Sequence, residues 1–125
     1  NFPIKFMHDI TEGGLAVGVA EIAIASNSGV LIEENLIKIL PEPLELSKVF
    51  NLNPLNTISS GTLLIGLEKA YTGELIDYFK KNHIYAEKIG EVRSYKEGLK
   101  IKSIKNKIEP LNYSETDEIT KIFKF

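Results

Sequence analysis

The segment between His8 and Gly14 contains the residue types of this sequence that could do chemistry. Thr11 could cap a helix, and the glycine pair before the apolar run could let another molecule approach the backbone. The first free N–H groups of a helix carry partial positive charge, so this combination is typical of a phosphate site. The expected phosphate-binding or nucleotide-binding residues are Asp9, Thr11, Gly13 and Gly14.

Two side chains could extend this site. The carboxylate of Asp9 could ligate Mg²⁺, which prefers one or two carboxylates together with phosphate oxygens. His8 could donate a hydrogen bond to the same anion or orient a reacting group. The alternative interpretation is that Asp9 and Thr11 only cap a helix and that the glycines only turn the chain. The segment has neither the Walker spacing nor the three-glycine dinucleotide fingerprint.

A second small, polar turn precedes a strand-like run. Ser60 and Gly61 are its candidate accessory residues, and an ordinary turn is the alternative. In α/β sheets, ligands usually lie beyond the C-terminal ends of strands. This turn would therefore face the same ligand as Asp9 only if its strand ran antiparallel to the first strand.

The elements that position these residues alternate between strand and helix. The expected strands cover residues 4–8, 30–33, 36–40, 62–67, 84–92 and 99–104, and the expected helices cover 15–25, 44–50 and 72–82, with a last turn capped by residues 114–117. The continuous apolar run at 62–67 predicts a central strand covered on both faces. Lys100 and Lys102 predict an edge strand.

This alternation predicts an α/β two-layer fold, with one mixed β-sheet and helices packed on it. Helix 44–50 has an apolar stripe formed by Leu46, Val49 and Phe50. The length of 125 residues, 43% of them apolar and 26% charged, predicts a single globular domain over residues 1–125. Because the chain begins with Asn1 inside strand-like sequence, we expect a fragment of a longer protein.

Composition also narrows the function classes. The formal net charge is −2 and the lysines are scattered along the sequence, so nucleic acid is not an expected partner. The longest apolar run, from Leu15 to Ala25, is too short for a membrane span. The sequence contains no cysteine, which excludes disulfides and thiolate chemistry and agrees with a cytoplasmic location.

The stretch from Met7 to Leu15 resembles the C-terminal domain of the aminoimidazole ribonucleotide (AIR) synthase-related superfamily. The pattern Asp-x-Thr-x-Gly-Gly-Leu is followed by Glu21-Ile22-Ala23, and the likeness continues in order over most of the chain. The later matching segments are Gly29-Val30, Asn53-Pro54-Leu55, Ser60-Gly61-Thr62-Leu63-Leu64-Ile65, Ile89-Gly90-Glu91-Val92 and Asp117-Glu118-Ile119. The chain is most similar to HypE-like members, the hydrogenase expression/formation proteins.

The resemblance implies an AIR synthase C-terminal domain-like fold and an ATP-dependent parent enzyme that transfers a phosphoryl group with Mg²⁺. ATP would be held largely by an N-terminal ATP-binding domain of the same parent, commonly in a homodimer. This domain would form the substrate-side wall of the cleft, and Asp9 and the Gly13-Gly14 amides would be its contributions. Alone, it would be inactive and would hold neither ATP nor Mg²⁺ tightly.

Two departures leave an alternative function open. HypE itself ends in a cysteine tail, whereas this chain ends Ile122-Phe123-Lys124-Phe125 and has no cysteine. The HypE-like glutamate before Gly61 is Ser60 here. The alternative is a non-catalytic binding or assembly module related to hydrogenase maturation proteins, with the apolar tail docking on a partner domain.

Overall fold

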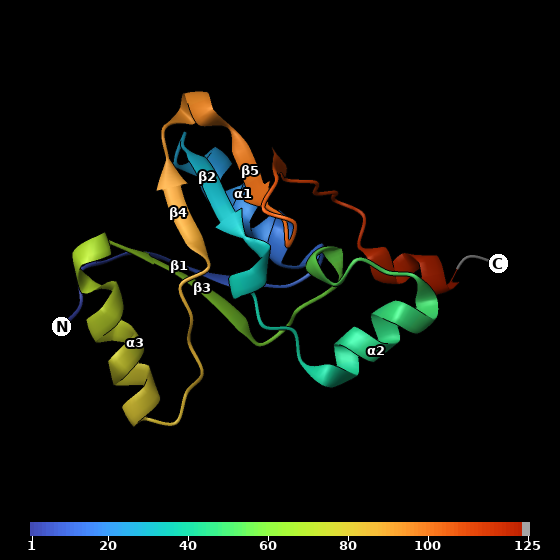
Figure 1. Ribbon diagram of the computed structural model, residues 1–125, viewed down its shortest axis with the longest axis horizontal. Coiled ribbons are helices and arrows are strands. Elements are labelled where there is room, and N and C mark those ends of the chain that lie inside the picture. The colour runs from blue at the N-terminus through green and yellow to red at the C-terminus, as the bar shows by residue number, and fades with distance from the viewer. Residues whose placement is uncertain (124–125) are drawn as a thin grey trace.

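The computed structural model describes residues 1–123 (Figure 1). Its strands are β1 (Ile4–Ile10), β2 (Gly29–Glu33), β3 (Thr62–Leu67), β4 (Gly90–Arg93), β5 (Leu99–Lys102) and β6 (Ile108–Pro110). Its α-helices are α1 (Gly14–Ala25), α2 (Pro41–Phe50) and α3 (Thr72–Lys81). Short 3-10 helices are η1 (Glu34–Leu36), η2 (Pro54–Asn56), η3 (Lys69–Tyr71), η4 (Tyr95–Glu97) and η5 (Glu118–Phe123). Residues 124 and 125, the end of the expected apolar tail, lie outside the described residues.

The strands form two sheets. A mixed sheet has the order β4-β2-β5-β6, in which β2 and β5 run parallel and the other neighbours run antiparallel. Strands β1 and β3 form a separate antiparallel pair. Helix α1 lies behind the mixed sheet, while α3 and α2 lie at opposite ends of the view in Figure 1. The expected α/β class, with helices on a mixed sheet, is confirmed, and the two-stranded pair is an addition to it.

The core forms where α1 packs between the two sheets. Its buried members are Ile10, Leu15, Ala16, Val19, Ile32, Leu55 and Leu111. Gly18 lets β1 approach closely, because a Cβ at that position would lie 2.1 Å from Ile10 Cδ1. Small residues on α1 therefore explain why an alanine-rich helix is buried on most sides.

Several expected strands differ from the observed ones. The run at 62–67 is a strand but not a central one, because β3 pairs only with β1 within residues 1–123 and Leu63 is 47% exposed. Strand β5 lies between β2 and β6, so the edge position expected from Lys100 and Lys102 is wrong. Strand β6, from the C-terminal part of the chain, pairs with the edge of β5 that would otherwise be open.

Two other expected strands are shorter or absent. Residues 36–40 form no strand, because Ile37 and Ile39 pack on the core as single side chains without ladder partners. Only Gly90–Arg93 of the expected 84–92 strand pairs, with β2. Conversely, β1 continues past His8 to Ile10, because pairing with β3 extends it.

The helices are close to the expected ones. Helix α1 spans Gly14–Ala25, and Asn27 after it has φ 51°, the left-handed conformation that commonly ends a helix. Helix α2 begins earlier than expected, at Pro41, and its apolar stripe is exposed: Val49 is 73% exposed and Leu46 56%. Within residues 1–123, no helix combines the length and apolarity needed to cross a bilayer.

Candidate functional site

The loop after β1 and the turn before β3 lie side by side. Antiparallel pairing aligns Ile10 with Thr62, so the end of β1 meets the beginning of β3. The backbone N–H of Ser59 donates to the carbonyl oxygen of Thr11 at 3.3 Å. The antiparallel direction required for a shared site is therefore present.

Asp9 and His8 lie on opposite faces of β1. Successive side chains of a strand alternate between its faces. His8 Nε2 forms a 2.7 Å hydrogen bond with Glu21 Oε2 on α1, so the imidazole lies on the helix side. Asp9 pairs with Leu63 in the register and has an exposed side chain. The geometry thus separates the two side chains that were expected to lie beside one anion.

Two glycines, both with positive φ, form the entry to α1. Gly13 is the N-cap with φ 77°, and Gly14 has φ 69°. No side chain caps the helix, so the expected capping role of Thr11 is wrong. Thr11 instead accepts backbone N–H groups through its carbonyl oxygen, from Gly14 and from Ser59, each at 3.3 Å. The left-handed turn places the backbone of Thr11, and not its hydroxyl, next to the helix.

Packing within the chain explains the absence of a side chain at Gly14. A Cβ there would lie 2.5 Å from the carbonyl oxygen of Thr57 and 2.6 Å from that of Leu55. The close approach that the sequence assigned to another molecule is thus made within the same chain, by Leu55 of η2 and by Thr57, which follows η2.

The amide of Gly13 already binds an anionic oxygen. Its N–H donates to Asp117 Oδ2 at 2.6 Å in a buried contact. Asp117 is 7% exposed, and its other oxygen, Oδ1, accepts the N–H of Ile119 at 2.9 Å. The sequence had assigned Asp117 only to the cap of the last helical turn, which the Ile119 contact confirms. The longer-range role was missed because nothing local marks a partner 104 positions away.

Polar contacts also hold the rest of the closing segment. Glu118 Oε2 accepts the N–H of Asn53 at 3.2 Å, and the hydrogen bond from Lys121 is the main cause that lowers the pKa of Glu118. Asn56, only 6% exposed, donates from Nδ2 to the carbonyl oxygen of Asn112 at 3.0 Å. A cavity of about 400 Å³ adjoins these contacts, lined by Asn51, Leu52, Asn53, Asn56, Asn112, Ser114, Glu118 and Lys121. After the buried Leu111, the segment from Asn112 onward is therefore attached largely through hydrogen bonds.

Ser60 and Gly61 form the open side of the candidate site. Both are exposed, and a Cβ at Gly61 would have nothing within 4 Å, although φ is 90°. Ser59 Oγ and Thr62 Oγ1 lie 2.8 Å apart and close the base of the turn. The exposed turn therefore has a defined shape and room for another molecule beside it.

No group of three or more potential metal ligands occurs within residues 1–123. The exposed carboxylate of Asp9 fits the requirement of Mg²⁺ for one protein carboxylate, provided that other ligands come from phosphate oxygens and water.

Comparison with known proteins defines the class. The family model described as AIR synthase related protein, C-terminal domain, matches residues 1–102. The chain therefore belongs to the AIR synthase-related family and corresponds to its C-terminal domain. This confirms the family resemblance seen in the sequence.

Among individual proteins, the chain is similar to HypE and to selenide, water dikinase. It is 34% identical over 67 residues to carbamoyl dehydratase HypE of Rhodobacter capsulatus, covering 54% of this chain and 20% of that protein. It is 37% identical over 93 residues to selenide, water dikinase of Methanocaldococcus jannaschii, covering 72% of this chain and 26% of that protein. The chain thus spans about a quarter or less of the length of these relatives.

Solved structures of HypE share the fold. Escherichia coli HypE superposes with a TM-score of 0.80 at 24% identity over 94% of this chain and 37% of that chain. HypE in complex with ATP gives a TM-score of 0.80 at 22% identity, over 91% of this chain and 37% of that chain. A chain from the structure of the HypE-HypF complex gives a TM-score of 0.78 at 22% identity, over 90% of this chain and 37% of that chain.

Proposed function

We propose that this chain forms the substrate-side wall of a phosphate and Mg-nucleotide cleft in a HypE-like, ATP-dependent enzyme. The observation that carries the proposal is the meeting of the Asp9–Gly14 loop with the Ser60-Gly61 turn at the N-terminus of α1. The similar HypE whose structure contains ATP supports a nucleotide as the ligand. An N-terminal ATP-binding domain of the same parent would hold most of that nucleotide.

In this proposal, Asp9 binds the metal ion and the backbone at the entry of α1 binds phosphate. The exposed carboxylate of Asp9 would ligate Mg²⁺ together with phosphate oxygens. Thr11, Gly13 and Gly14 would contact phosphate through their backbone N–H groups, and those of Gly13 and Gly14 would then give up their present acceptors, Asp117 Oδ2 and the carbonyl oxygen of Thr11. The Asp117 contact supports this preference, because it places an anionic oxygen on the Gly13 amide. A phosphate at that amide would take the place of the Asp117 carboxylate.

In this proposal the longer parent transfers a phosphoryl group from ATP and this chain alone does not. Catalysis of such transfers relies mostly on positioning and on charge stabilisation. The parent would be a cytoplasmic homodimer.

The experiment measures ATP hydrolysis and nucleotide affinity in a form that includes the N-terminal domain. Asp9→Asn should lower kcat by at least about tenfold, because a metal ligand is lost while the side-chain shape is kept. Glu109→Gln, an exposed acid on β6, is the matched control and should change neither quantity. Unchanged activity and affinity in both Asp9→Asn and Gly61→Val would refute the proposed cleft wall.

A binding or assembly module without catalysis is the second candidate function. It is favoured by the exposed stripe of α2, where Leu46, Val49 and Phe50 are 56%, 73% and 45% exposed. Such apolar surface is typical of contact with another protein or domain. A full-length form that bound no nucleotide, yet formed a stable protein complex lost on Val49→Asp, would favour this function over the cleft.

A further inference from the structure

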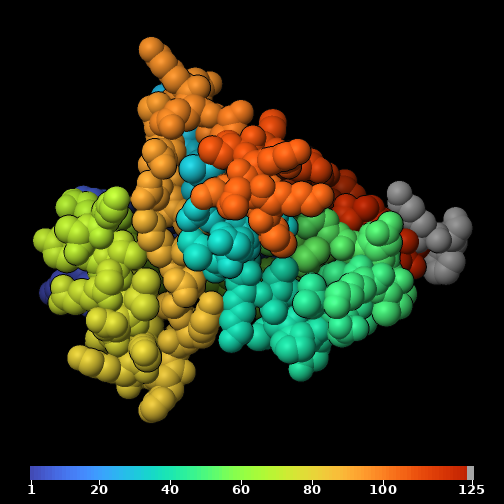
Figure 2. Space-filling model, viewed as in Figure 1, coloured from blue at the N-terminus to red at the C-terminus, as the bar shows by residue number. Residues whose placement is uncertain are grey.

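The outward face of the mixed sheet gathers charged side chains that are far apart in the sequence. Residues aligned in the register share a face, and the inward set of Val30, Ile32, Leu99 and Ile101 packs on the core. The outward set comprises Leu31, Glu33, Glu91, Arg93, Lys100 and Lys102, and it is joined by Lys88 before β4 and by Lys69 of η3. We call these residues the outer sheet face. Figure 2 shows the atoms of β4, β2 and β5 at the molecular surface on this side.

Positive charge dominates the outer sheet face. It carries five cations, Lys69, Lys88, Arg93, Lys100 and Lys102, against the two carboxylates of Glu33 and Glu91. The whole chain has a formal net charge of −2, so its acidic excess lies elsewhere. A local field of this sign attracts anionic groups to a flat, open surface.

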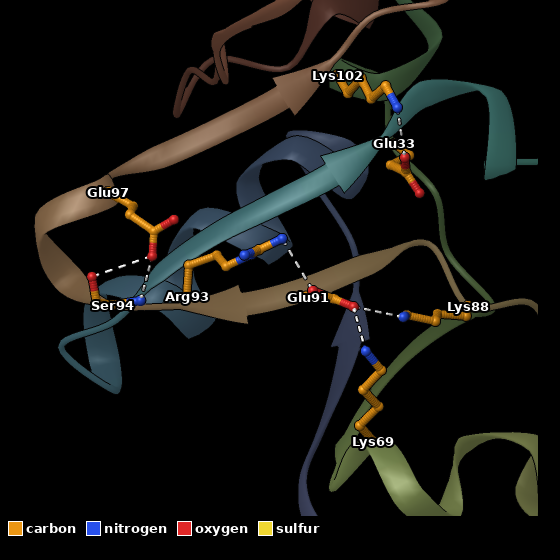
Figure 3. A network of polar contacts seen from close by, with 8 residues as sticks. All are labelled: Glu33, Lys69, Lys88, Glu91, Arg93, Ser94, Glu97 and Lys102. Atoms are coloured by element: carbon orange, nitrogen blue, oxygen red, sulfur yellow. Dashed lines mark hydrogen bonds and ion pairs between the residues drawn. The ribbon is translucent and has the colours of Figure 1, made fainter. Parts of the chain in front are cut away.

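Ion pairs hold four of these cations in place, namely Lys69, Lys88, Arg93 and Lys102 (Figure 3). Glu91 lies between Lys88 Nζ at 2.8 Å, Arg93 Nη2 at 3.1 Å and Lys69 Nζ at 3.7 Å. The hydrogen bond and charge of Lys88 are the largest causes that lower the pKa of Glu91, so this carboxylate stays ionised. Lys102 Nζ lies 3.4 Å from Glu33 Oε1. Cations fixed in this way lose less side-chain entropy when they bind another group.

The shape of the face suits single carboxylate side chains. A hollow of about 180 Å³ has Leu31 and Gly90 in its lining, together with Lys88, Arg93 and the two glutamates. Lys100 and Lys102 stand two residues apart on β5, or about 7 Å along a strand. An extended peptide repeats its own side chains on one face at the same interval.

We propose that the outer sheet face docks an extended acidic segment of a partner protein, with carboxylates at alternate positions. Arg93 can pair with a carboxylate through its planar fork, and the lysines can pair as point charges. Glu33 and Glu91 line the same hollow and would repel a multiply charged phosphate chain. Carboxylates of a peptide carry one charge each at intervals of about 7 Å, so the repulsion on each of them is weaker.

The test uses the 125-residue chain and a fluorescent peptide of about eight alternating Glu and Ser residues. We expect binding that weakens as salt rises, with amide NMR shifts confined to β2, β4 and β5. Replacing Lys88, Arg93 and Lys102 with serine should weaken binding about tenfold or more. The single variant Arg93→Ser should weaken it about threefold, which keeps the test valid if the triple variant does not fold.

The matched control removes the same charge elsewhere, through Lys80→Ser, Lys81→Ser and Lys105→Ser. It should change affinity less than about twofold. An equal loss in the control would show unspecific attraction and overturn the proposal. Tighter binding of pyrophosphate or of an oligothymidylate would identify a phosphate surface instead. Loss of peptide binding when the N-terminal domain is present would show that the parent itself covers this face, which also overturns the proposal.

Discussion

The backbone N–H of Gly13 and the carboxylate of Asp117 form a 2.6 Å hydrogen bond between positions 104 residues apart. The contact joins the entry of α1 to the segment before η5. The entry of α1 thus holds a negatively charged oxygen, as the partial positive charge of a helix N-terminus favours. The candidate phosphate site and the closure of the fold thus share one amide group.

Removing the Asp117 carboxylate should destabilise the chain markedly. Asp117→Ala leaves the buried Gly13 N–H without its charged acceptor, a loss that costs about 1.5–3 kcal/mol of unfolding free energy. Urea unfolding followed by circular dichroism measures it. Glu115→Ala, an exposed neighbour, should change stability by less than about 0.5 kcal/mol. Equal effects of the two substitutions would contradict a structural role of the contact.

A methyl group at Gly14 should be far more harmful than one at Gly73. Gly14→Ala combines positive φ with carbonyl oxygens at 2.5 and 2.6 Å, so we expect a loss of about 3 kcal/mol or more. Gly73 has open space around its Cβ position within α3, so Gly73→Ala should be neutral or stabilise by up to about 1 kcal/mol. Thermal unfolding of the two variants, side by side, tests this order.

The pH dependence of stability should include a contribution from Glu91. Lys88, by its hydrogen bond first and its charge second, lowers the folded-state pKa of Glu91. The stabilisation is therefore present above the unfolded glutamate pKa of about 4.3 and is lost as pH falls through the lower folded-state value. The Tm difference between the natural chain and Glu91→Gln should be constant near neutral pH and shrink in acid. A difference that grew below pH 4 would have the wrong sign.

The stripe on α2 should contribute little to the stability of this chain. Leu46 is 56% exposed, so Leu46→Ala should cost less than about 0.5 kcal/mol. Leu75 on α3 is 6% exposed, and Leu75→Ala should cost about 2–5 kcal/mol. Chemical denaturation of both variants gives the comparison. A large loss at Leu46 would mean that the stripe packs within the chain.

Local signals in the sequence were sufficient to predict α1, α3 and the class of fold. The apolar spacing of α1 and the Gly13-Gly14 pair before it mark that helix, and the alternation of strands with helices marks an α/β fold. The order of the strands in the sheets could not be predicted from these local signals. The apolar run of β3 is compatible with a covered central strand and with a two-stranded pair, and only long-range pairing distinguishes them.

The candidate site was predictable in composition but not in geometry. Residue types identified the Asp9–Gly14 segment, and the antiparallel pairing of β1 with β3 then placed Ser60 and Gly61 beside it. The separation of His8 from Asp9 follows from strand alternation once β1 extends to Ile10. Asp117 and the packing of η2 against Gly14 depend on distant segments, and so no local pattern reveals them.

The position of Leu111 in the core determines when this domain can fold during its synthesis on the ribosome. This side chain is 6% exposed and packs in the cluster that contains Ile10 and Leu15, near the other end of the chain. The N-terminal helix therefore cannot complete its buried environment until almost the whole chain has been synthesised. Folding of this domain is delayed until Leu111 has left the ribosome, and the nascent chain must keep its apolar α1 protected until then.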